Sequence, residues 1–466
     1  MTILSVIGLA ALAFLAAAFG LLAGPGRAEL VLLLPLAMAC IALLGVRFPG
    51  WTPAVLVLIG ALVPYHVSFV GKTPFGVVSV LGAVGALLFA IVLATHRTRI
   101  SRLRRSPEVL GLLGWIGILA ASSLMAGNLK VTLDRTRLVA VAMVGAYLAG
   151  RVIARVDSLA LSRVVFVVGI VSVLAILEQF TGLSPYDWVP ATGFPLEPTG
   201  EATRFGLLRV RLGFYHGSVL GTLFAVCIGL IVVRARLTAR HTGPWIWLTT
   251  VVALFFTLTS QAWLAATAAL LVLSLGLRRA RGALVVATLI GTVVISSGAV
   301  PALSSLVEVR LRPTGSYQDQ TDYRLALLPA AIEFANTGPL LGAGPGTFNS
   351  LGLTALINNE TTLLIDDNTY TAILVEAGYP GLLAFVLALV LVAVRLARRA
   401  ERWQAWTGLA ALAAWMVMGL SVDLLASDQV LMLVWLIFGL LAGYPGRAKP
   451  AAEVTTAATT RLGVRA

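Results

Sequence analysis

The chain has little charge and almost no cysteine, and each shortage excludes a class of protein. Charged residues make up 12% of its 466 residues and hydrophobic residues 59%, whereas soluble proteins carry roughly a quarter charged residues. A soluble fold could not bury that much apolar surface. The two cysteines, Cys40 and Cys227, both lie in apolar runs, so we expect no disulfide or metal framework. Short strands of alternating polarity are absent too, which argues against a membrane barrel.

Long apolar runs are abundant instead, and they predict an all-α polytopic membrane protein. Runs such as 3–22 and 75–94 reach the ~20 residues with which a helix crosses a bilayer, and backbone groups in lipid must be satisfied within their own segment. We predict about 12 to 14 transmembrane helices in one domain, 1–449, followed by a disordered cytoplasmic tail, 450–466. The predicted spans are 3–22, 29–46, 52–70, 74–95, 108–126, 137–154, 162–180, 214–233, 243–259, 261–277, 282–301, 369–394, 404–421 and 428–444.

The formal net charge of +14 is concentrated in short basic segments between these runs. If six of the segments face the cytoplasm, the positive-inside rule is satisfied and the spans alternate without contradiction. The six segments are 97–105, 151–163, 234–240, 278–281, 395–402 and 447–449. Both termini are then cytoplasmic. The membrane explains this charge, so we predict no nucleic-acid partner.

Two long loops, 181–211 and 303–368, then lie on the extracytoplasmic side and hold most of the acidic residues. Long loops in a compact bundle are usually functional or disordered. Within the second loop, residues 323–336 have a helical pattern with an apolar side formed by Leu325, Leu327, Leu328, Ile332 and Phe334. We predict a helix there, lying along the outer membrane–water boundary. Any chemistry is expected in these two loops.

The first candidate group is Arg204, Arg209 and Arg211, which oppose the charge bias near the outer surface. Guanidinium groups pair bidentately with phosphate or carboxylate. For Arg204 and Arg209, lipid headgroups or acidic loop residues are equally good partners. Arg211 lies closest to the membrane and is the better candidate for a diphosphate ligand. His216 could bind phosphate or relay a proton, although a lone histidine at an interface is more often structural.

The second candidate group lies in residues 321–348. Arg324 begins the predicted loop helix, where it would either capture a substrate anion or pair with Asp322 or Glu333. Three glycines within 342–346 allow tight turns and a close approach of backbone amides to a ligand or another helix; a structural turn is the preferred interpretation. Their spacing matches a dinucleotide fingerprint only in part, and no Lys-Ser/Thr pair follows, so nucleotide binding is rejected.

The third candidate group is found just before and within the span at 369–394. Adjacent carboxylates such as Asp366 and Asp367 raise one another's proton affinity, which would leave one able to act as a base. Alternatively, Asp367 or Asn368 caps the helix. Glu376 lies inside the predicted span, where an ionisable residue suggests function by default, or else is a protonated or paired packing residue.

The order of these parts resembles the O-antigen ligase and O-antigen polymerase superfamily of bacterial membrane glycosyltransferases, from about 172 to 392. The pieces that carry the resemblance are Arg-x-Gly-Phe at 211–214, Thr-Ser at 259–260, Arg324 with Pro-Leu-x-Gly-x-Gly at 339–344, Asn-x-Tyr at 368–370 and Glu-x-Gly-x-x-Gly at 376–381. Two positions depart from the ligase pattern. Gln261 stands where ligases commonly have an arginine, and Asp367 where they have a histidine, which leaves a polymerase or a divergent transferase more open.

The resemblance implies a GT-C-like helical fold in a bacterial inner (cytoplasmic) membrane and a metal-independent, cofactor-free reaction. A glycan would pass from undecaprenyl diphosphate to the hydroxyl of a glycan or glycolipid acceptor, with membrane lipids as the other partners. The implied diphosphate ligands are Arg211, Arg324, Arg209, Arg204 and His216. The implied base is Asp367 or Asp366, Arg324 also takes part in catalysis, and Glu376 and Tyr370 are further site residues.

Two other function classes compete with this hypothesis. A transporter or flippase for lipid-linked glycans would explain the many spans and the polar residues Glu178 and Glu376 near helix ends. Transporters often show two similar halves, however, and no repeat is evident here. A non-catalytic assembly component would use the outer loops to bind partners.

Overall fold

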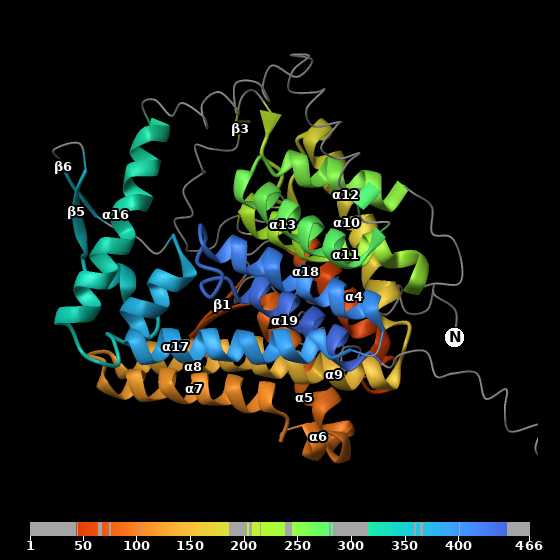
Figure 1. Cartoon of the computed structure of the whole chain (residues 1–466), viewed down its shortest axis with the longest axis horizontal. Coiled ribbons are helices and arrows are strands. Elements are labelled where there is room, and N and C mark those ends of the chain that lie inside the picture. The colour runs from red at the N-terminus through yellow and green to blue at the C-terminus, as the bar shows by residue number, and fades with distance from the viewer. Residues whose placement is uncertain are drawn as a thin grey trace, which may run out of the picture.

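A computed structural model describes residues 43, 45–63, 68–73, 76–103, 105–185, 203–204, 207–214, 216–237, 245–278, 281–282, 316–357, 360–363, 367–399 and 401–444. These residues form a bundle of apolar helices with short two-stranded hairpins (Figure 1). The helices are η2 (Pro49–Trp51), α4 (Thr52–Leu62), α5 (Val80–Thr95), α6 (Arg97–Leu103), α7 (Pro107–Met125), α8 (Leu129–Ala140), the π-helical turn η3 (Val141–Gly145), α9 (Ala146–Val156), α10 (Ala160–Thr181), α11 (Gly217–Leu237), α12 (Trp245–Phe256), α13 (Ser260–Gly276), α16 (Ser316–Thr337), η5 (Phe348–Ser350), α17 (Thr369–Ala397), α18 (Arg402–Gly419) and α19 (Asp428–Gly443). The antiparallel strand pairs are β1 (Ser68–Thr73) with β2 (Gly76–Ser79), β3 (Thr203–Arg204) with β4 (Leu207–Leu208), and β5 (Thr354–Ile357) with β6 (Glu360–Leu363).

The predicted all-α polytopic membrane fold is confirmed. Four described helices are long and apolar enough to cross a membrane, and six shorter apolar helices accompany them. The four are Pro107–Met125, Leu129–Val156, Ala160–Thr181 and Thr369–Ala397. The predicted spans 3–22 and 282–301, most of 29–46, and the predicted tail lie outside the described residues.

Two predicted spans are wrong at the ends that face each other. The span predicted at 52–70 ends as a helix at Leu62, and the span predicted at 74–95 begins as a helix only at Val80. The hairpin β1–β2 occupies the intervening chain. Its first strand, SFVGKT, contains a lysine, which is costly at the centre of a lipid-embedded helix.

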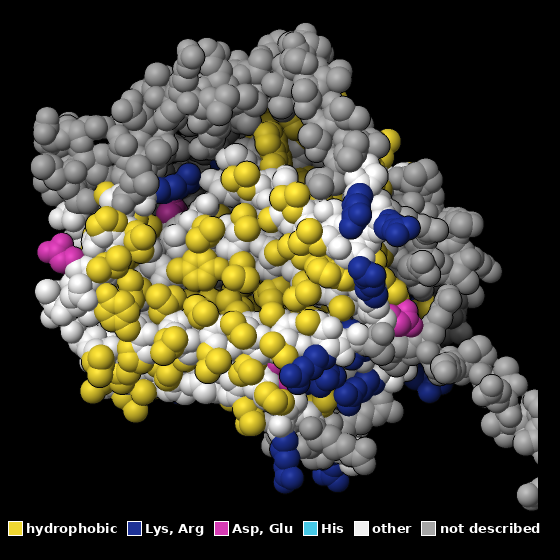
Figure 2. Space-filling view, in the orientation of Figure 1, with side chains coloured by type: hydrophobic (Ala, Val, Ile, Leu, Met, Phe, Trp, Pro, Cys, Tyr) yellow, Lys and Arg dark blue, Asp and Glu magenta, His cyan; other side chains and the backbone are white. Residues whose placement is uncertain are grey.

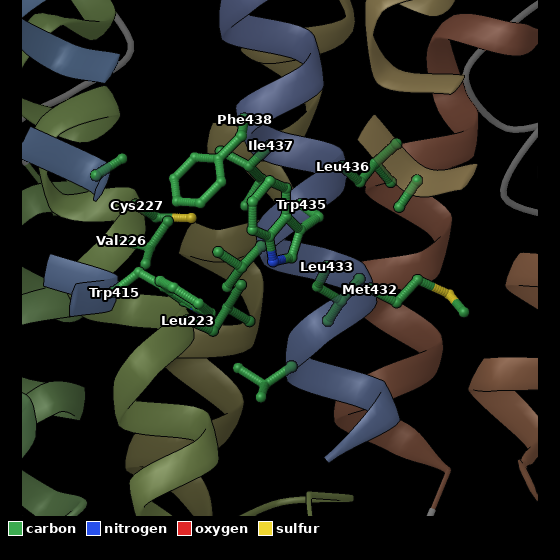
Figure 3. Close-up of a cluster of buried hydrophobic side chains, with 14 of the residues drawn as sticks. Leu223, Val226, Cys227, Trp415, Met432, Leu433, Trp435, Leu436, Ile437 and Phe438 are labelled. Carbon is green, nitrogen blue, oxygen red and sulfur yellow. The ribbon is translucent and has the colours of Figure 1, made fainter. Parts of the chain in front are cut away.

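The centre of the bundle is occupied by α19, every residue of which is buried. It packs against α9, α18, α11, α4 and α5. Figure 3 shows Trp435 and Phe438 of this helix beside Trp415 of α18 and Cys227 of α11, while Met432 points the other way. A helix that is apolar all round needs such complete burial or lipid around it.

Glycines allow α9 and α19 to approach closely. A Cβ atom at Gly150 would lie 2.8 Å from the backbone nitrogen of Leu440, and one at Gly443 would lie 2.6 Å from the Cα atom of Arg151. Gly439 and Gly443 are four residues apart, the spacing that places small residues on one face of a membrane helix. The two backbones therefore pack with no side chain between them at these points.

Helix α17 is longer than the hydrocarbon core of a bilayer is thick. Its 29 residues span roughly 43 Å, whereas the hydrocarbon core is ~30 Å thick. Non-helical angles at Gly378 divide the helix, and the part that follows is roughly 28 Å long. The exposed leucine and valine side chains of α17 all follow this break: Leu383, Val386, Leu387, Val390 and Val394. In Figure 2 a band of hydrophobic side chains crosses the molecule, with lysine and arginine gathered at its right-hand end.

The part of α17 before the break packs against α16, at the left of Figure 1. Leu327 and Ala331 of α16 are buried together with Leu374 and Val375 of α17. The predicted loop helix is therefore present. Its predicted apolar side is only partly correct, because Leu328 is 53% exposed while Leu327, one residue earlier, is 2% exposed. The predicted position of this helix along the membrane boundary remains a prediction.

Candidate functional site

The start of α17 is fixed by Asn368, the residue that follows the candidate base. The Asn368 side chain accepts hydrogen bonds from the backbone N–H groups of Tyr370 (2.8 Å) and Thr371 (3.2 Å), and its amide donates to the carbonyl of Leu420 (2.9 Å). Of the two capping residues that the sequence allowed, Asn368 caps the helix. Asp367 is half-buried directly before this cap, where the positive end of the helix dipole favours a negatively charged group.

The glycine segment 342–346 fills the break in α17. Ala343 N–H donates to the carbonyl of Val375 (3.0 Å), and Gly344 N–H donates to the carbonyl of Glu376 (2.9 Å). Gly342 has φ +73° and Gly378 has φ +67°, and a Cβ atom at either would overlap the backbone of the other segment. The amides thus contact another helix, and the preferred interpretation of these glycines as a structural turn fits the observed contacts.

Glu376 sits at this junction. Its carbonyl also accepts a hydrogen bond from the Ser122 hydroxyl (2.6 Å), and its Oε1 atom lies 3.4 Å from the backbone nitrogen of Phe348. Glu376 precedes the break at Gly378, in the part of α17 that extends beyond the exposed apolar band. Tyr370 lies on the same part, and its hydroxyl donates to the carbonyl of Met416 (3.0 Å).

Arg324 lies on α16, one turn before the buried Leu327, and is half-buried. Residues three apart share a helix face, so Arg324 is on the side of α16 that packs against α17. Its Nε atom is inaccessible to solvent and has no hydrogen-bond partner among the described residues. The predicted alternative of a pair with Glu333 is not formed, and the side chain of Asp322 lies outside the described atoms. A half-buried guanidinium without a carboxylate partner among the described side chains is suited to an anionic ligand.

Arg209 connects the first loop to the turn between α12 and α13. Its side chain is 8% exposed and donates to the carbonyl of Thr257 (3.4 Å) and the hydroxyl of Thr259 (3.3 Å). The backbone N–H of Val210 donates to the carbonyl of Phe256 (3.1 Å). These contacts give Arg209 a bracing function, and its predicted contact with diphosphate remains untested.

Arg211 belongs to a turn that a buried glutamate holds. One carboxylate oxygen of Glu178, a residue only 3% exposed, accepts hydrogen bonds from the N–H groups of Arg211 (3.2 Å) and Leu212 (2.8 Å). Leu212 has φ +52°, an uncommon value for a non-glycine residue. Gly213 donates to the carbonyl of Ala61 (2.8 Å). Glu178 therefore shapes the Arg-x-Gly-Phe turn and leaves the Arg211 side chain half-buried.

His216 caps α11. Its Nδ1 atom lies 2.7 Å from the Ser218 hydroxyl and 3.2 Å from the Ser218 nitrogen. This geometry agrees with the structural alternative for His216. Of the other predicted site residues, Asp366 and the side chain of Arg204 lie outside the described atoms.

The sequence pieces that carried the resemblance form two contacting pairs. In the first pair, the Arg-x-Gly-Phe turn at 211–214 comes two residues after Arg209, and Arg209 bonds to the turn that ends in the Thr-Ser pair at 259–260. In the second pair, the segment 339–344 bonds to α17 at 375–376. Helix α18 shows how the two pairs are placed. Its last residues bond to Asn368, and its first turns pack against Gly276 at the C-terminal end of α13. Helices α13 and α18 are therefore antiparallel, and the start of α13 lies near the end of α18. Both pairs therefore lie at the same end of the bundle.

One arginine at this end was missed. Arg135 of α8 donates from Nη2 to the carbonyl of Leu425 and from Nη1 to that of Ala426 (3.4 Å), and a Cβ atom at Gly346 would lie 3.5 Å from its side chain. The sequence does contain an indication of Arg135. This arginine lies between two predicted spans on the outer side, where its charge opposes the positive-inside bias, as the charge of Arg211 does.

A family comparison bears on this arrangement. Residues 245–386 match the family model described as O-Antigen ligase. This segment of the chain is similar to the O-antigen ligase family. The match confirms the resemblance to the O-antigen ligase and polymerase superfamily of membrane glycosyltransferases. No curated protein matches the chain.

The matched segment covers just under a third of the chain and includes α12, α13, α16 and the first part of α17. Arg324, Asp367, Tyr370 and Glu376 lie inside it, as does the glycine segment. Arg209, Arg211 and His216 precede it. The contact between Arg209 and the threonines at 257 and 259 joins this preceding turn to the matched segment.

Proposed function

We propose that the protein transfers a glycan from a polyprenyl-diphosphate carrier to an acceptor hydroxyl at the end of the bundle where α17 begins. The observation that carries this proposal is Arg324, whose half-buried guanidinium has no carboxylate partner among the described side chains and lies within the segment that matches the O-antigen ligase family. The long apolar helices support a lipid-linked donor, because its hydrocarbon chain can stay in the membrane while its diphosphate reaches the helix ends.

The reaction exchanges one bond to the anomeric carbon for another. The acceptor oxygen forms a bond to that carbon, and the bond between the carbon and the diphosphate oxygen breaks. The electron pair of the broken bond leaves with the polyprenyl diphosphate, and the acceptor proton passes to a base. Arg324 and Arg211 stabilise the charge that develops on the diphosphate, which lowers the barrier because those charges are already in place.

Asp367 is the proposed base. It precedes the first turn of α17, and capping of that turn is carried out by Asn368. The positive end of the helix favours the ionised form of a nearby carboxylate, which is the form that accepts a proton. A base of this kind contributes a factor of about 100 to 10,000 to the rate.

The test uses purified full-length protein with a polyprenyl-diphosphate glycan and an acceptor. Arg324→Ala is expected to lower kcat on the order of 100-fold or more, as does the loss of other preorganised charge-stabilising groups. Asp367→Asn is expected to keep the fold and lose turnover. Matched controls are Arg137→Ala and Asp134→Asn, which alter an ion pair between the middle and the last turn of α8 and should leave turnover unchanged. Wild-type turnover in Arg324→Ala would rule out the proposed role.

A transporter of lipid-linked glycans is the competing class, and the break in α17 is the feature that would favour it. Broken helices in transporters leave backbone groups that bind substrate or ions. Here the carbonyls of Val375 and Glu376 already accept hydrogen bonds from the glycine segment, which favours the transferase. Liposomes with a labelled donor separate the two, because a transporter moves the donor unchanged and a transferase consumes it.

A further inference from the structure

Three arginines gather at the opposite end of the bundle from α16. Arg395 lies in the last turn of α17, Arg399 follows directly after that helix, and Arg151 is near the end of α9. We refer to Arg151, Arg395 and Arg399 as the arginine cluster. The start of α7 adds one carboxylate, Glu108, which is 3% exposed.

The contacts of the arginine cluster leave its charge only partly compensated. Arg151 donates to Glu108 and to the Ser106 hydroxyl (2.9 Å), and the Nε atom of Arg395 lies 3.7 Å from the same Glu108 oxygen. One carboxylate thus serves two guanidinium groups, and Arg399 forms no ion pair with a described residue.

Helix capping accounts for part of the arrangement. Arg395 and Arg399 both donate to the carbonyl of Ala442 in the last turn of α19, at 3.4 and 3.1 Å, and cations are stabilised near a helix C-terminus. Both arginines share this single carbonyl, however. The buried Nε atoms of all three arginines have no hydrogen-bond partner among the described residues. Capping and Glu108 together therefore use only part of the available donors and charge.

Electrostatic repulsion within the cluster acts on Arg399. Its burial lowers the pKa of the guanidinium to about 10, and the neighbouring charges of Arg395, Arg151 and Arg155 act in the same direction. A bound anion would offset this repulsion. A group with two or more oxygens would also suit guanidinium donors, which bind phosphate bidentately.

We propose that the arginine cluster binds the phosphate of an anionic phospholipid headgroup. Its position favours a lipid source, because Val390 and Val394 expose their side chains on the turns of α17 that lead to Arg395. The Arg395 side chain itself is 31% exposed. A lipid whose acyl chains lie along this apolar face would place its headgroup at the cluster, and basic pockets between membrane helices are suited to such headgroups.

The experiment measures lipid binding by full-length protein in nanodiscs of phosphatidylcholine that contain a titrated fraction of phosphatidylglycerol. Bound phosphatidylglycerol is quantified by native mass spectrometry after release from the nanodisc. The variants are Arg399→Gln and the double variant Arg395→Gln/Arg399→Gln. The matched control is Arg398→Gln, which removes the same charge from an exposed neighbour. Thermal unfolding confirms that each variant is folded, and Arg399→Gln alone decides the result if the double variant fails to fold.

Each basic residue near anionic lipid contributes a factor of about five in affinity. Arg399→Gln should therefore weaken phosphatidylglycerol binding about fivefold and the double variant roughly 25-fold, with Arg398→Gln close to wild type. Equal effects at Arg398 and Arg399 would indicate general surface attraction and overturn the proposal. Displacement of the lipid by excess inorganic phosphate, with no lipid retained, would assign the cluster to a soluble anion and overturn the lipid source. Binding is read without turnover, so failure here leaves the proposed transferase function unaffected.

Discussion

Replacing Gly378 by alanine tests whether the glycine segment and the break in α17 form one unit. The φ angle at Gly378 is +67°, and a left-handed or otherwise sparsely populated backbone costs a non-glycine residue roughly 1–3 kcal/mol. The new Cβ atom would overlap the carbonyl oxygen of Leu340 and lie 3.2 Å from the nitrogen of Gly342. The segment would have to move away, and two hydrogen bonds to 375–376 would be lost at about 1 kcal/mol each. The total expected loss is about 3–5 kcal/mol.

Two further glycines separate the contributions to this loss. Gly182, the C-cap of α10, has φ +69°, but no atom lies within 4 Å of the position that an alanine Cβ would take, so Gly182→Ala tests backbone strain alone, about 1–2 kcal/mol. Gly114, inside α7, has free space and an ordinary helical angle, so Gly114→Ala should be neutral or stabilising by up to about 1 kcal/mol.

The assay is the midpoint of thermal unfolding of the purified protein in detergent, together with transferase turnover. We expect the midpoint to fall in the order Gly114→Ala, Gly182→Ala, Gly378→Ala. We also expect Gly378→Ala to lose turnover at temperatures at which it is still folded, because Asn368 and Asp367 lie on the same short helical part. Equal midpoints for Gly182→Ala and Gly378→Ala would refute the packing argument, because the contact with Leu340 would then contribute nothing.

Three other substitutions have defined outcomes. Glu178→Gln keeps an oxygen that can accept the N–H groups at 211 and 212 but removes the negative charge; replacing a charged acceptor by a neutral one should cost about 1–2 kcal/mol, seen as a lower unfolding midpoint and a higher KM for the donor, and an unchanged midpoint would contradict it. Asn368→Ala removes the cap of α17, for about 1 kcal/mol, whereas Asn368→Asp should retain most of that stability in the same unfolding assay. Arg135→Ala removes the bonds to the carbonyls at 425 and 426; it should lower the midpoint more than Arg137→Ala, because the Arg137 side chain is 53% exposed, and the reverse order would exclude a structural role for Arg135.

The helix ends that the sequence predicted well are those where the apolar run is followed within a few residues by glycine or asparagine, which commonly end a helix. Helix α7 ends at Met125 and α10 at Thr181, each within one residue of the predicted end. The error at 52–70 arose because a short apolar strand and a helix look alike in composition. The hairpin after α4 was therefore included in a predicted span. The break at Gly378 was hidden for a similar reason, since hydropathy does not report φ angles.

The sequence was enough to predict which residues belong to the candidate site. It predicted only some of the contacts that those residues make. Residues 366–368 suggested both a base and a cap, and the structure assigns the cap to Asn368. By contrast, the carboxylate that holds the Arg211 turn is Glu178, more than thirty residues earlier in the chain. Such a partner becomes visible only when α10 and the turn are placed side by side. The same holds for Arg209, whose threonine partners lie about fifty residues later.

The position of α19 has a consequence for biogenesis. This helix is the last of the described helices to leave the ribosome, yet it occupies the middle of the bundle and is buried along its whole length. The helices made before it, including α4, α5, α9 and α11, enter the membrane without the surface that they will finally share. They must therefore remain separable, or be held by insertion factors, until α19 arrives between them. The order of synthesis and the order of packing are reversed in this protein, and its assembly is committed only when the helix at 428–443 is in place.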